Sequence, residues 1–251
     1  MIDYLFIGAQ KTGSNSFIGY MNEHPDIYCC KKEIHYFDIK YNKKDFNWYE
    51  KHFKTKKTIV GEKSPSYLLD KRAINRIYNY NPNIKLIIFL REPIQRAYSH
   101  FNMKYPIVKE RGNINKIFNE DINQQKDIPL DKYIENISQK STAFIHRGFY
   151  YEQIIYIYSL FPKENVLILI SDENKKDILK CYNKIFTFLG VKKLSNIKNN
   201  NRHAGTYPEE LDMTNKKLLY KIYKPHNEKL YNLLGRKVDL WEEYYNEFIN
   251  L

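Results

Sequence analysis

The sequence predicts an α/β protein, a single domain over residues 1–251 with a central parallel sheet and helices on both faces. Short apolar, β-branched runs alternate along the chain with longer segments whose apolar residues recur every three or four positions. This alternation is typical of a parallel sheet that is covered on both sides. A chain of 251 residues can bury one substantial core, and it contains no internal repeat and no linker.

The strands of this sheet are expected at residues 4–7, 58–60, 84–90 and 165–170, and a short extended segment begins at residue 27. The run at 84–90 is continuous and β-branched, as a central parallel strand should be.

Helices are expected where the three-and-four spacing recurs, namely over residues 15–21, 45–53, 70–80, 93–103, 145–160, 175–189 and 214–234. Pro93 has the favoured first-turn position, Gly190 ends a helix, and Thr214 is expected to cap the last helix. Residues 105–142 are polar and are expected to form a variable insertion with short helices. Residues 196–208 read as a loop, and an aromatic tail begins at Trp241.

The charge balance indicates anionic partners. Lys and Arg number 41 against 29 Asp and Glu, a formal net charge of +12. Nucleotides, acidic glycans, nucleic acid and membrane surfaces all fit such a balance. The basic residues are spread along the chain without a long run, which argues against nucleic acid.

The three cysteines, Cys29, Cys30 and Cys181, form neither a disulfide framework nor a set with metal-ligand spacing. A reducing compartment fits them best. No apolar run approaches the roughly twenty residues of a membrane span, and no signal peptide precedes the first strand. We therefore expect a cytoplasmic protein without a metal site.

The loop Gly8–Ser14 (Gly-Ala-Gln-Lys-Thr-Gly-Ser) joins the first strand to the first helix. A strand, a tight glycine-containing loop and a helix point backbone N–H groups at a bound anion, and Lys11 adds a full positive charge. The loop is not a Walker A motif, because Lys11 precedes Gly13 and does not follow it. Phosphate binding is the favoured interpretation, and an ordinary βα turn is the alternative.

A second anion site is indicated by Arg91 and Ser99. Arg91 stands at the carboxyl end of the central strand, the edge where open α/β sheets bind ligands. Ser99 follows eight residues later, a little over two helical turns. Two phosphate sites imply a nucleotide that is phosphorylated at two distant places.

These segments resemble the sulfotransferases that use 3′-phosphoadenosine 5′-phosphosulfate (PAPS), in particular the heparan-sulfate N- and 3-O-sulfotransferase domains and their bacterial relatives. Residues 61–67 (Gly-Glu-Lys-Ser-Pro-Ser-Tyr) and 31–38 (Lys-Lys-Glu-Ile-His-Tyr-Phe-Asp) resemble motifs of that family. So do residues 147–153, 160–162 and 224–231. The resemblance covers nearly the whole chain.

The resemblance implies a P-loop-NTPase-like sulfotransferase fold and a transferase that moves the sulfuryl group from PAPS to a hydroxyl or amine of a glycan or glycoconjugate, releasing PAP. It implies that Arg91 and Ser99 hold the 3′-phosphate, that Glu33 is the general base, and that Lys63 is a second cation near the sulfuryl group. The 5′-phosphosulfate would be held by consecutive residues of the first loop and helix: Lys11, Thr12, Gly13, Ser14, Asn15 and Ser16. Sulfuryl transfer relies on in-line positioning and charge stabilisation, which lysines provide.

Two residues compete for the role of general base. Glu33 is favoured by the pattern, although the ordinary pKa of a glutamate near 4.3 suits an acceptor hydroxyl poorly. His35 lies two residues further on, on the same face of the expected strand, and is the rival base. Among the many aromatic residues, Tyr36, Phe37 and Tyr67 are the ones expected near an acceptor.

The sequence departs from the family at residues 201–208 (Asn-Arg-His-Ala-Gly-Thr-Tyr-Pro), where N-sulfotransferases have a more basic loop between two cysteines. Arg202 and His203 are the candidates for the missing cations. The rival functions are a P-loop kinase and a basic nucleic-acid-binding module. A kinase is disfavoured by the displaced lysine and by the lack of a strand ending in a Walker B-like aspartate. The acceptor and the oligomeric state are not predicted.

Overall fold

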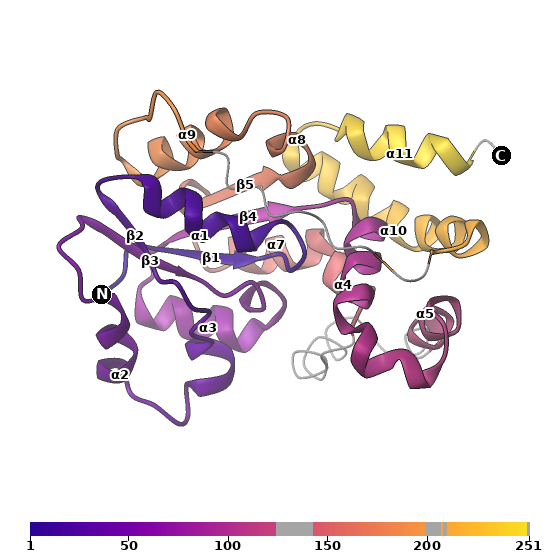
Figure 1. Cartoon of the computed structure of the whole chain (residues 1–251), viewed down its shortest axis with the longest axis horizontal. Coiled ribbons are helices and arrows are strands. Elements are labelled where there is room, and N and C mark those ends of the chain that lie inside the picture. Colours follow the sequence, from indigo (N-terminus) through magenta and orange to yellow (C-terminus); the bar gives the residue numbers. More distant parts are fainter. Residues whose placement is uncertain (124–142, 199–206, 208–209, 250–251) are drawn as a thin grey trace. The chain divides into compact units, whose positions relative to one another are not determined.

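The computed structural model describes residues 1–123, 143–198, 207 and 210–249 (Figure 1). The chain divides into two compact units. The first comprises residues 1–90 and 156–203, and the second comprises residues 91–155 and 204–251. The prediction of one domain over the whole chain stays a prediction.

The first unit contains the five-stranded parallel sheet that the sequence predicts. Its strands are β1 (Tyr4–Gly8), β2 (Ile27–Cys29), β3 (Ile59–Lys63), β4 (Lys85–Leu90) and β5 (Val166–Ile170). Their spatial order is β2-β3-β1-β4-β5, and every neighbouring pair is parallel. The chain builds outward from β1 in both directions, so the strand order reverses there. In open α/β sheets this is the position where ligands bind, at the carboxyl ends of the strands.

One face of the sheet is covered by α1 (Ser14–Glu23) and α9 (Ile178–Leu189), which Figure 1 shows above the strands. Phe6 and Phe89 from the strands meet Phe17 of α1, with ring centroids 4.6 and 5.9 Å from the Phe17 ring. Tyr182 of α9 joins the same cluster at 6.1 Å from Phe17. Burial of such aromatic side chains dominates core energetics, which explains why this apolar face is closed by helices.

The opposite side of the sheet carries α3 (Lys71–Tyr80), with Ala73, Ile74 and Ile77 buried. The connection between β2 and β3 contains a π-helical turn η1 (Tyr36–Lys40), α2 (Phe46–Glu50) and a 3₁₀ turn η2 (Lys51–Phe53). Another 3₁₀ turn, η3 (Tyr67–Leu69), leads from β3 towards α3. The helices on both faces confirm the predicted fold class.

The second unit is built from helices: α4 (Pro93–Val108), the 3₁₀ turn η4 (Lys109–Arg111), α5 (Ile114–Asn123), the 3₁₀ turn η5 (His146–Gly148), α10 (Met213–Leu234) and α11 (Asp239–Ile249). Helix α7 (Tyr150–Tyr158) spans the boundary between the two units. Between residues 158 and 178 the first unit adds the 3₁₀ turn η6 (Lys163–Asn165) and the short α8 (Ser171–Asn174).

Several boundaries differ from the sequence predictions. Helix α4 continues past residue 103 to Val108, so only residues 109–123 of the expected insertion form separate short helices, and 124–142 lie outside the described residues. Asp212, not Thr214, caps α10, because its carboxylate accepts the Asn215 N–H. The expected helix 145–160 is two elements. A Cβ atom at Gly148 would lie 2.8 Å from the Tyr223 ring, which indicates a close approach at the point of division.

The expected helix over residues 175–189 begins later, at Ile178, and Asp177 caps it. Its predicted end is confirmed, because Gly190 adopts the left-handed conformation with φ 80°. All three cysteines are buried free thiols. Among the described residues, the helices are too short or too polar to cross a membrane.

Candidate active site

The predicted anion loop lies at the carboxyl edge of the sheet, beside the end of β3. Phe6 of β1 is in register with Lys63 of β3, and the Ser64 N–H donates to the Phe6 carbonyl at 3.0 Å. The residues that follow β1 and β3 therefore leave the sheet side by side, which is the arrangement that open α/β sheets use for ligands.

Close packing fixes the start of the loop. Gly8 has φ 156°, and a Cβ atom there would lie 2.6 Å from Leu68 Cβ and 3.0 Å from the Pro65 carbonyl. The Ala9 N–H donates to the Phe89 carbonyl at 2.8 Å. Glycine is required at position 8 because no side chain fits between the loop and the segment after β3.

Helix α1 begins at the end of the loop. Gly13 is the N-cap with φ 84°, and it has no side chain to occupy the N–H groups of the first turn. These groups remain suited to an anion, and the helix dipole adds positive potential there. Lys11 has a left-handed backbone with φ 71°. The buried Thr12 hydroxyl donates to the Ala9 carbonyl at 2.7 Å, so it ties the loop together.

Ser16 lies in the first turn of α1, where its N–H donates to the Gly13 carbonyl at 3.1 Å. The side chains of Ser14 and Asn15 lie outside the described structure. The donor-binding role of these residues stays a prediction.

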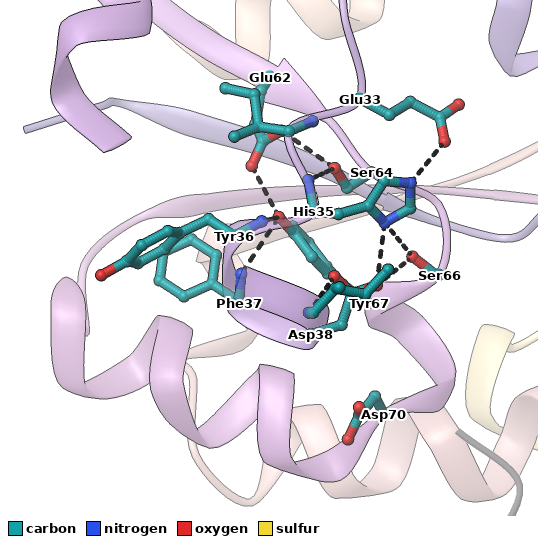
Figure 2. Close-up of polar contacts among 12 residues, drawn as sticks. Glu33, His35, Tyr36, Phe37, Asp38, Glu62, Ser64, Ser66, Tyr67 and Asp70 are labelled. Carbon is teal, nitrogen blue, oxygen red and sulfur yellow. Dashed lines mark hydrogen bonds and ion pairs between the residues drawn. The ribbon is translucent and has the colours of Figure 1, made fainter. Parts of the chain in front are cut away.

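The two candidate bases and Lys63 form a compact cluster next to this loop. Lys63 Nζ lies 2.6 Å from Glu33 Oε1, and His35 Nε2 lies 3.2 Å from Glu33 Oε2. On its other side, His35 Nδ1 contacts Asp38 Oδ2 at 3.0 Å, and the Ser66 hydroxyl donates to the same oxygen at 2.6 Å. Figure 2 shows the imidazole ring between Glu33 on one side and Asp38 with Ser66 on the other.

The backbone of this cluster is not the strand that the sequence predicts. Strand β2 ends at Cys29, and the residues around Glu33 are irregular. His35 is left-handed (φ 52°, ψ 39°) and precedes the π-helical turn η1. The expectation that Glu33 and His35 share a strand face is therefore wrong. Their side chains meet because the turn after His35 brings the imidazole between the two carboxylates.

The hydrogen bonds set the charge of the cluster. The carboxylate of Asp38, then that of Glu33, raises the pKa of His35 from 6.5 to about 9, so the ring is a cation at neutral pH. Burial pushes the pKa of Glu33 upward, but hydrogen bonds from His35 and Lys63 outweigh it and lower the pKa below its ordinary value. A cationic imidazole that donates from both nitrogens has no lone pair for an acceptor proton. This geometry favours Glu33 over His35 as base.

Asp38 and Ser66 were not among the predicted site residues. Burial raises the pKa of Asp38, but hydrogen bonds from His35 and Ser66 outweigh it, so the pKa lies below its ordinary value. Both residues belong to the sequence motifs at 31–38 and 61–67, and their polar side chains were the available signal.

A buried carboxylate fastens this segment to the sheet. Glu62 of β3 is fully buried, and its Oε1 accepts the hydroxyls of Tyr49 at 3.0 Å and Tyr67 at 2.9 Å. Its Oε2 accepts the Ser64 hydroxyl at 3.0 Å and the Ile34 N–H at 3.2 Å. Burial raises the pKa of Glu62, although these hydrogen bonds oppose the shift. The residue before His35 is held by Glu62 of β3, and the residue after it is held by Tyr67 of η3.

Tyr36, Phe37 and Tyr67, which the sequence predicts near an acceptor, are buried and cannot contact one. Their exposed fractions are 2%, 0% and 0%, and their rings pack together with Tyr49. The Tyr67 hydroxyl accepts the Tyr36 N–H at 2.9 Å. These aromatics are core residues and are unavailable for stacking on a sugar.

In the second unit, Arg91 lies two residues before the start of α4, and Ser99 lies within this helix. Arg91 Nη2 donates to Gln95 Oε1 at 3.4 Å, and the buried Ser99 hydroxyl lies 2.9 Å from the Tyr207 hydroxyl. Arg91 and Tyr207 contribute to a cavity of about 320 Å³ that is also lined by Gln95, Tyr98, Glu210, Leu211, Lys216 and Tyr244. Tyr207 is a residue that sequence reasoning did not single out. Arg202 and His203 lie outside the described residues.

The chain matches the sulfotransferase domain family over residues 2–233. It is 22% identical to the membrane-associated sulfotransferase kil1 of Dictyostelium discoideum, over 93% of this chain and 65% of that protein. It is 38% identical to the mouse heparan sulfate glucosamine 3-O-sulfotransferase 5 over 43% of this chain and 32% of that enzyme. The chain thus matches less than two thirds of the length of these relatives.

A solved structure supports the fold. The sulfotransferase from Alicyclobacillus acidocaldarius superposes with a TM-score of 0.78 at 24% identity, over 96% of this chain and 99% of that chain. The family match covers both the anion loop and the Glu33 cluster. This chain, with its parallel sheet and its strand-edge loop, belongs to the sulfotransferase family.

Proposed function

We propose that the chain is a PAPS-dependent sulfotransferase that transfers the sulfuryl group to a hydroxyl or amine of a glycan or glycoconjugate. One observation carries the proposal: a carboxylate, Glu33, is held between the cations Lys63 and His35 at the same sheet edge as the anion loop. The glycan acceptor is supported by the names of relatives such as the heparan sulfate glucosamine 3-O-sulfotransferases.

The donor is assigned to two groups of residues. The first-turn N–H groups of α1, with Lys11 beside them, suit the 5′-phosphosulfate, because Gly13 leaves these donors without a side-chain cap. Arg91 and Ser99 suit the 3′-phosphate, since a guanidinium and a hydroxyl both donate to phosphate oxygens.

In the proposed reaction, an oxygen or nitrogen of the acceptor attacks the sulfur of PAPS. The new bond to sulfur forms while the bond between sulfur and the bridging phosphate oxygen breaks, and its electron pair leaves with PAP. The acceptor proton passes to Glu33 Oε1 or Oε2. Lys11 and Lys63 stabilise the negative charge that develops on the sulfuryl and leaving oxygens, the dominant effect in this kind of transfer.

His35 is assigned a positioning role. As a cation, it donates to Glu33 from Nε2 and to Asp38 from Nδ1, and it thereby orients the carboxylate of the base. Ser66 fixes Asp38 from the other side. His35 thus aligns the base Glu33, and Asp38 in turn aligns His35, as in other sites where a base is oriented by further groups.

The test is transfer of labelled sulfate from PAPS to a panel of capsular, lipid-linked and free glycans. The wild-type chain is expected to label at least one acceptor, and Lys11→Ala is expected to abolish labelling with an unchanged melting temperature. A parallel binding assay compares PAP with ATP. Preference for ATP, or normal transfer by folded Lys11→Ala, would contradict the proposal.

A further inference from the structure

Lys63 forms an ion pair with the proposed base, Glu33, and the lysine side of this pair is almost fully buried. The Lys63 side chain is 2% exposed, the Glu33 side chain is 34% exposed, and the two charged atoms are 2.6 Å apart. The second oxygen of Glu33 is engaged by His35 at 3.2 Å. Both carboxylate oxygens are thus engaged by cationic donors, which weakens the carboxylate as an acceptor of a further proton.

The same lysine lies where the donor would arrive. It is the last residue of β3, and its register partner Phe6 lies two residues before Gly8, where the anion loop begins. A sulfuryl group held at that loop would present negatively charged oxygens at the edge where β1 and β3 end. Lys63 then has two anions available, the Glu33 carboxylate and the donor.

We infer that Lys63 acts as a gate, in the sense that it exchanges one anionic partner for another. Before PAPS binds, Lys63 forms an ion pair with Glu33. When PAPS binds, Lys63 moves to the sulfuryl group and so frees Glu33 Oε1 for the acceptor proton. This inference rests on the proposed function. It places donor binding before activation of the base, so that Glu33 is a competent proton acceptor only when the sulfuryl group is in place.

The electrostatics of the cluster agree with this order. Burial raises the pKa of Glu33, and the hydrogen bonds from His35 and Lys63 together bring it below its ordinary value. The charged groups with the largest effect on the pKa of Glu33 are Lys63 from β3 and His35 from its own segment, and Asp38 acts on His35. Withdrawal of Lys63 removes one of the two opposing cations, so the pKa of Glu33 rises and its strength as a base increases.

If Lys63 changes partners, the Glu33 carboxylate should affect the affinity of the protein for PAPS. If Glu33 and PAPS compete for Lys63, then Glu33 weakens PAPS binding in the free enzyme. Replacing the carboxylate should release the lysine and tighten the donor complex, even though the variant has lost its base. By the reciprocity of linked equilibria, protonation of Glu33 should have the same effect, so wild-type PAPS affinity should increase as the pH falls through the pKa of Glu33, which lies below its ordinary value.

The experiment is calorimetric titration of PAPS, without acceptor, into the full chain and four variants. Glu33→Gln is expected to bind PAPS roughly two- to fivefold more tightly than the wild type, the scale of a partly exposed ion pair. Asp38→Asn removes the same charge from the same cluster but leaves the contact between Lys63 and Glu33. It is the matched control, and no tightening is expected for it.

The remaining two variants form a double-mutant cycle. In a Lys63→Gln background, adding Glu33→Gln should no longer tighten PAPS binding, because the two changes act through one contact. The affinity of Lys63→Gln should also lose the increase at lower pH. A change that acted only through overall charge would persist in this background.

The outcomes separate the inference from the function on which it rests. No detectable binding of PAPS to the folded wild-type chain would overturn the proposed function and the gate together. Normal PAPS binding with an unchanged or weakened Glu33→Gln complex would overturn the gate alone. Tightening that persists without Lys63, or that Asp38→Asn reproduces, would also overturn it, and melting temperatures establish that each variant is folded.

Discussion

At the scale of single residues, the charge state of His35 decides how the cluster can work. Its ring donates to Glu33 and to Asp38, and these carboxylates raise its pKa to about 9. A histidine in that state orients the base and cannot replace it. Of the two candidate bases, Glu33 is the one that can accept a proton, and its affinity for protons depends on Lys63.

Glu33→Gln is expected to lower turnover by roughly a hundred- to ten-thousandfold, because the amide keeps the shape of the side chain but accepts no proton. His35→Asn should reduce turnover less, through poorer orientation of Glu33. Steady-state sulfate transfer measures both, with thermal melting to establish folding. An inactive His35→Asn beside an active Glu33→Gln would reverse the assignment of the base.

The raised pKa of His35 also predicts how stability depends on pH. The folded-state pKa of about 9 lies above the ordinary value of 6.5, so the imidazolium stabilises the fold fully below about pH 6.5. This contribution is lost as the pH rises from about 6.5 through about 9. Urea unfolding across this range should show a falling free energy of unfolding. A His35→Gln variant should show a flatter profile, and an identical decline in that variant would refute the assignment.

At the scale of structural elements, the connection after β2 depends on β3 for its conformation. The Tyr67 hydroxyl of η3 donates to the buried Glu62 carboxylate and accepts the Tyr36 N–H. The left-handed His35 and the start of the π-helical turn are held in place, because the backbone N–H groups on either side of His35 donate to side chains from β3 and η3.

Tyr67→Phe should lower the free energy of unfolding by roughly 1–3 kcal/mol, because it removes a buried donor to a carboxylate and a buried acceptor for an N–H. Tyr78→Phe, on the partly exposed side of α3, is the control and should change stability by less than about 0.5 kcal/mol. Chemical denaturation measures both variants. Equal effects would show that the Glu62 network contributes little to anchoring.

The segment that follows β4 contains Arg91, which is proposed to bind the 3′-phosphate of the donor. Arg91→Ala should weaken PAP binding by roughly ten- to a hundredfold and binding of adenosine 5′-phosphate much less, since charge-assisted contacts contribute about 1.5–3 kcal/mol. Arg236→Ala removes an exposed cation of the same unit and should affect neither ligand. Titration calorimetry compares them. Equal losses for both nucleotides would assign Arg91 a structural role.

At the scale of the whole molecule, the net charge of +12 bears on the acceptor. The positive charge of the protein should attract an anionic glycan, and dissolved salt should weaken this attraction. At 0.1 M ionic strength the Debye length is about 10 Å. The value of kcat/KM for an acidic acceptor should therefore fall several-fold between about 50 and about 200 mM salt, and that for a neutral acceptor should stay nearly constant. If kcat/KM depended on salt in the same way for both acceptors, the net charge of the protein would not contribute to the choice of acceptor.

The sequence alone determined the fold class and the place of the anion loop. Both follow from local patterns: short apolar runs form β1, β3 and β4, and glycines at positions 8 and 13 permit the turn into α1. It also identified Lys63, Glu33 and His35 through their motifs. Their family roles came with the resemblance, and those roles stay predictions.

Only the tertiary structure decided how these residues act on one another. Residues 33–38 and 62–66 are separated in sequence, and contacts between them pair Glu33 with Lys63 and Asp38 with Ser66. The left-handed turn at His35 brings its ring to Asp38. A pKa depends on burial and on every neighbouring charge, so it cannot be read from residues whose partners are brought together by folding. For the same reason Tyr36 and Phe37, which the sequence predicts near an acceptor, are core residues.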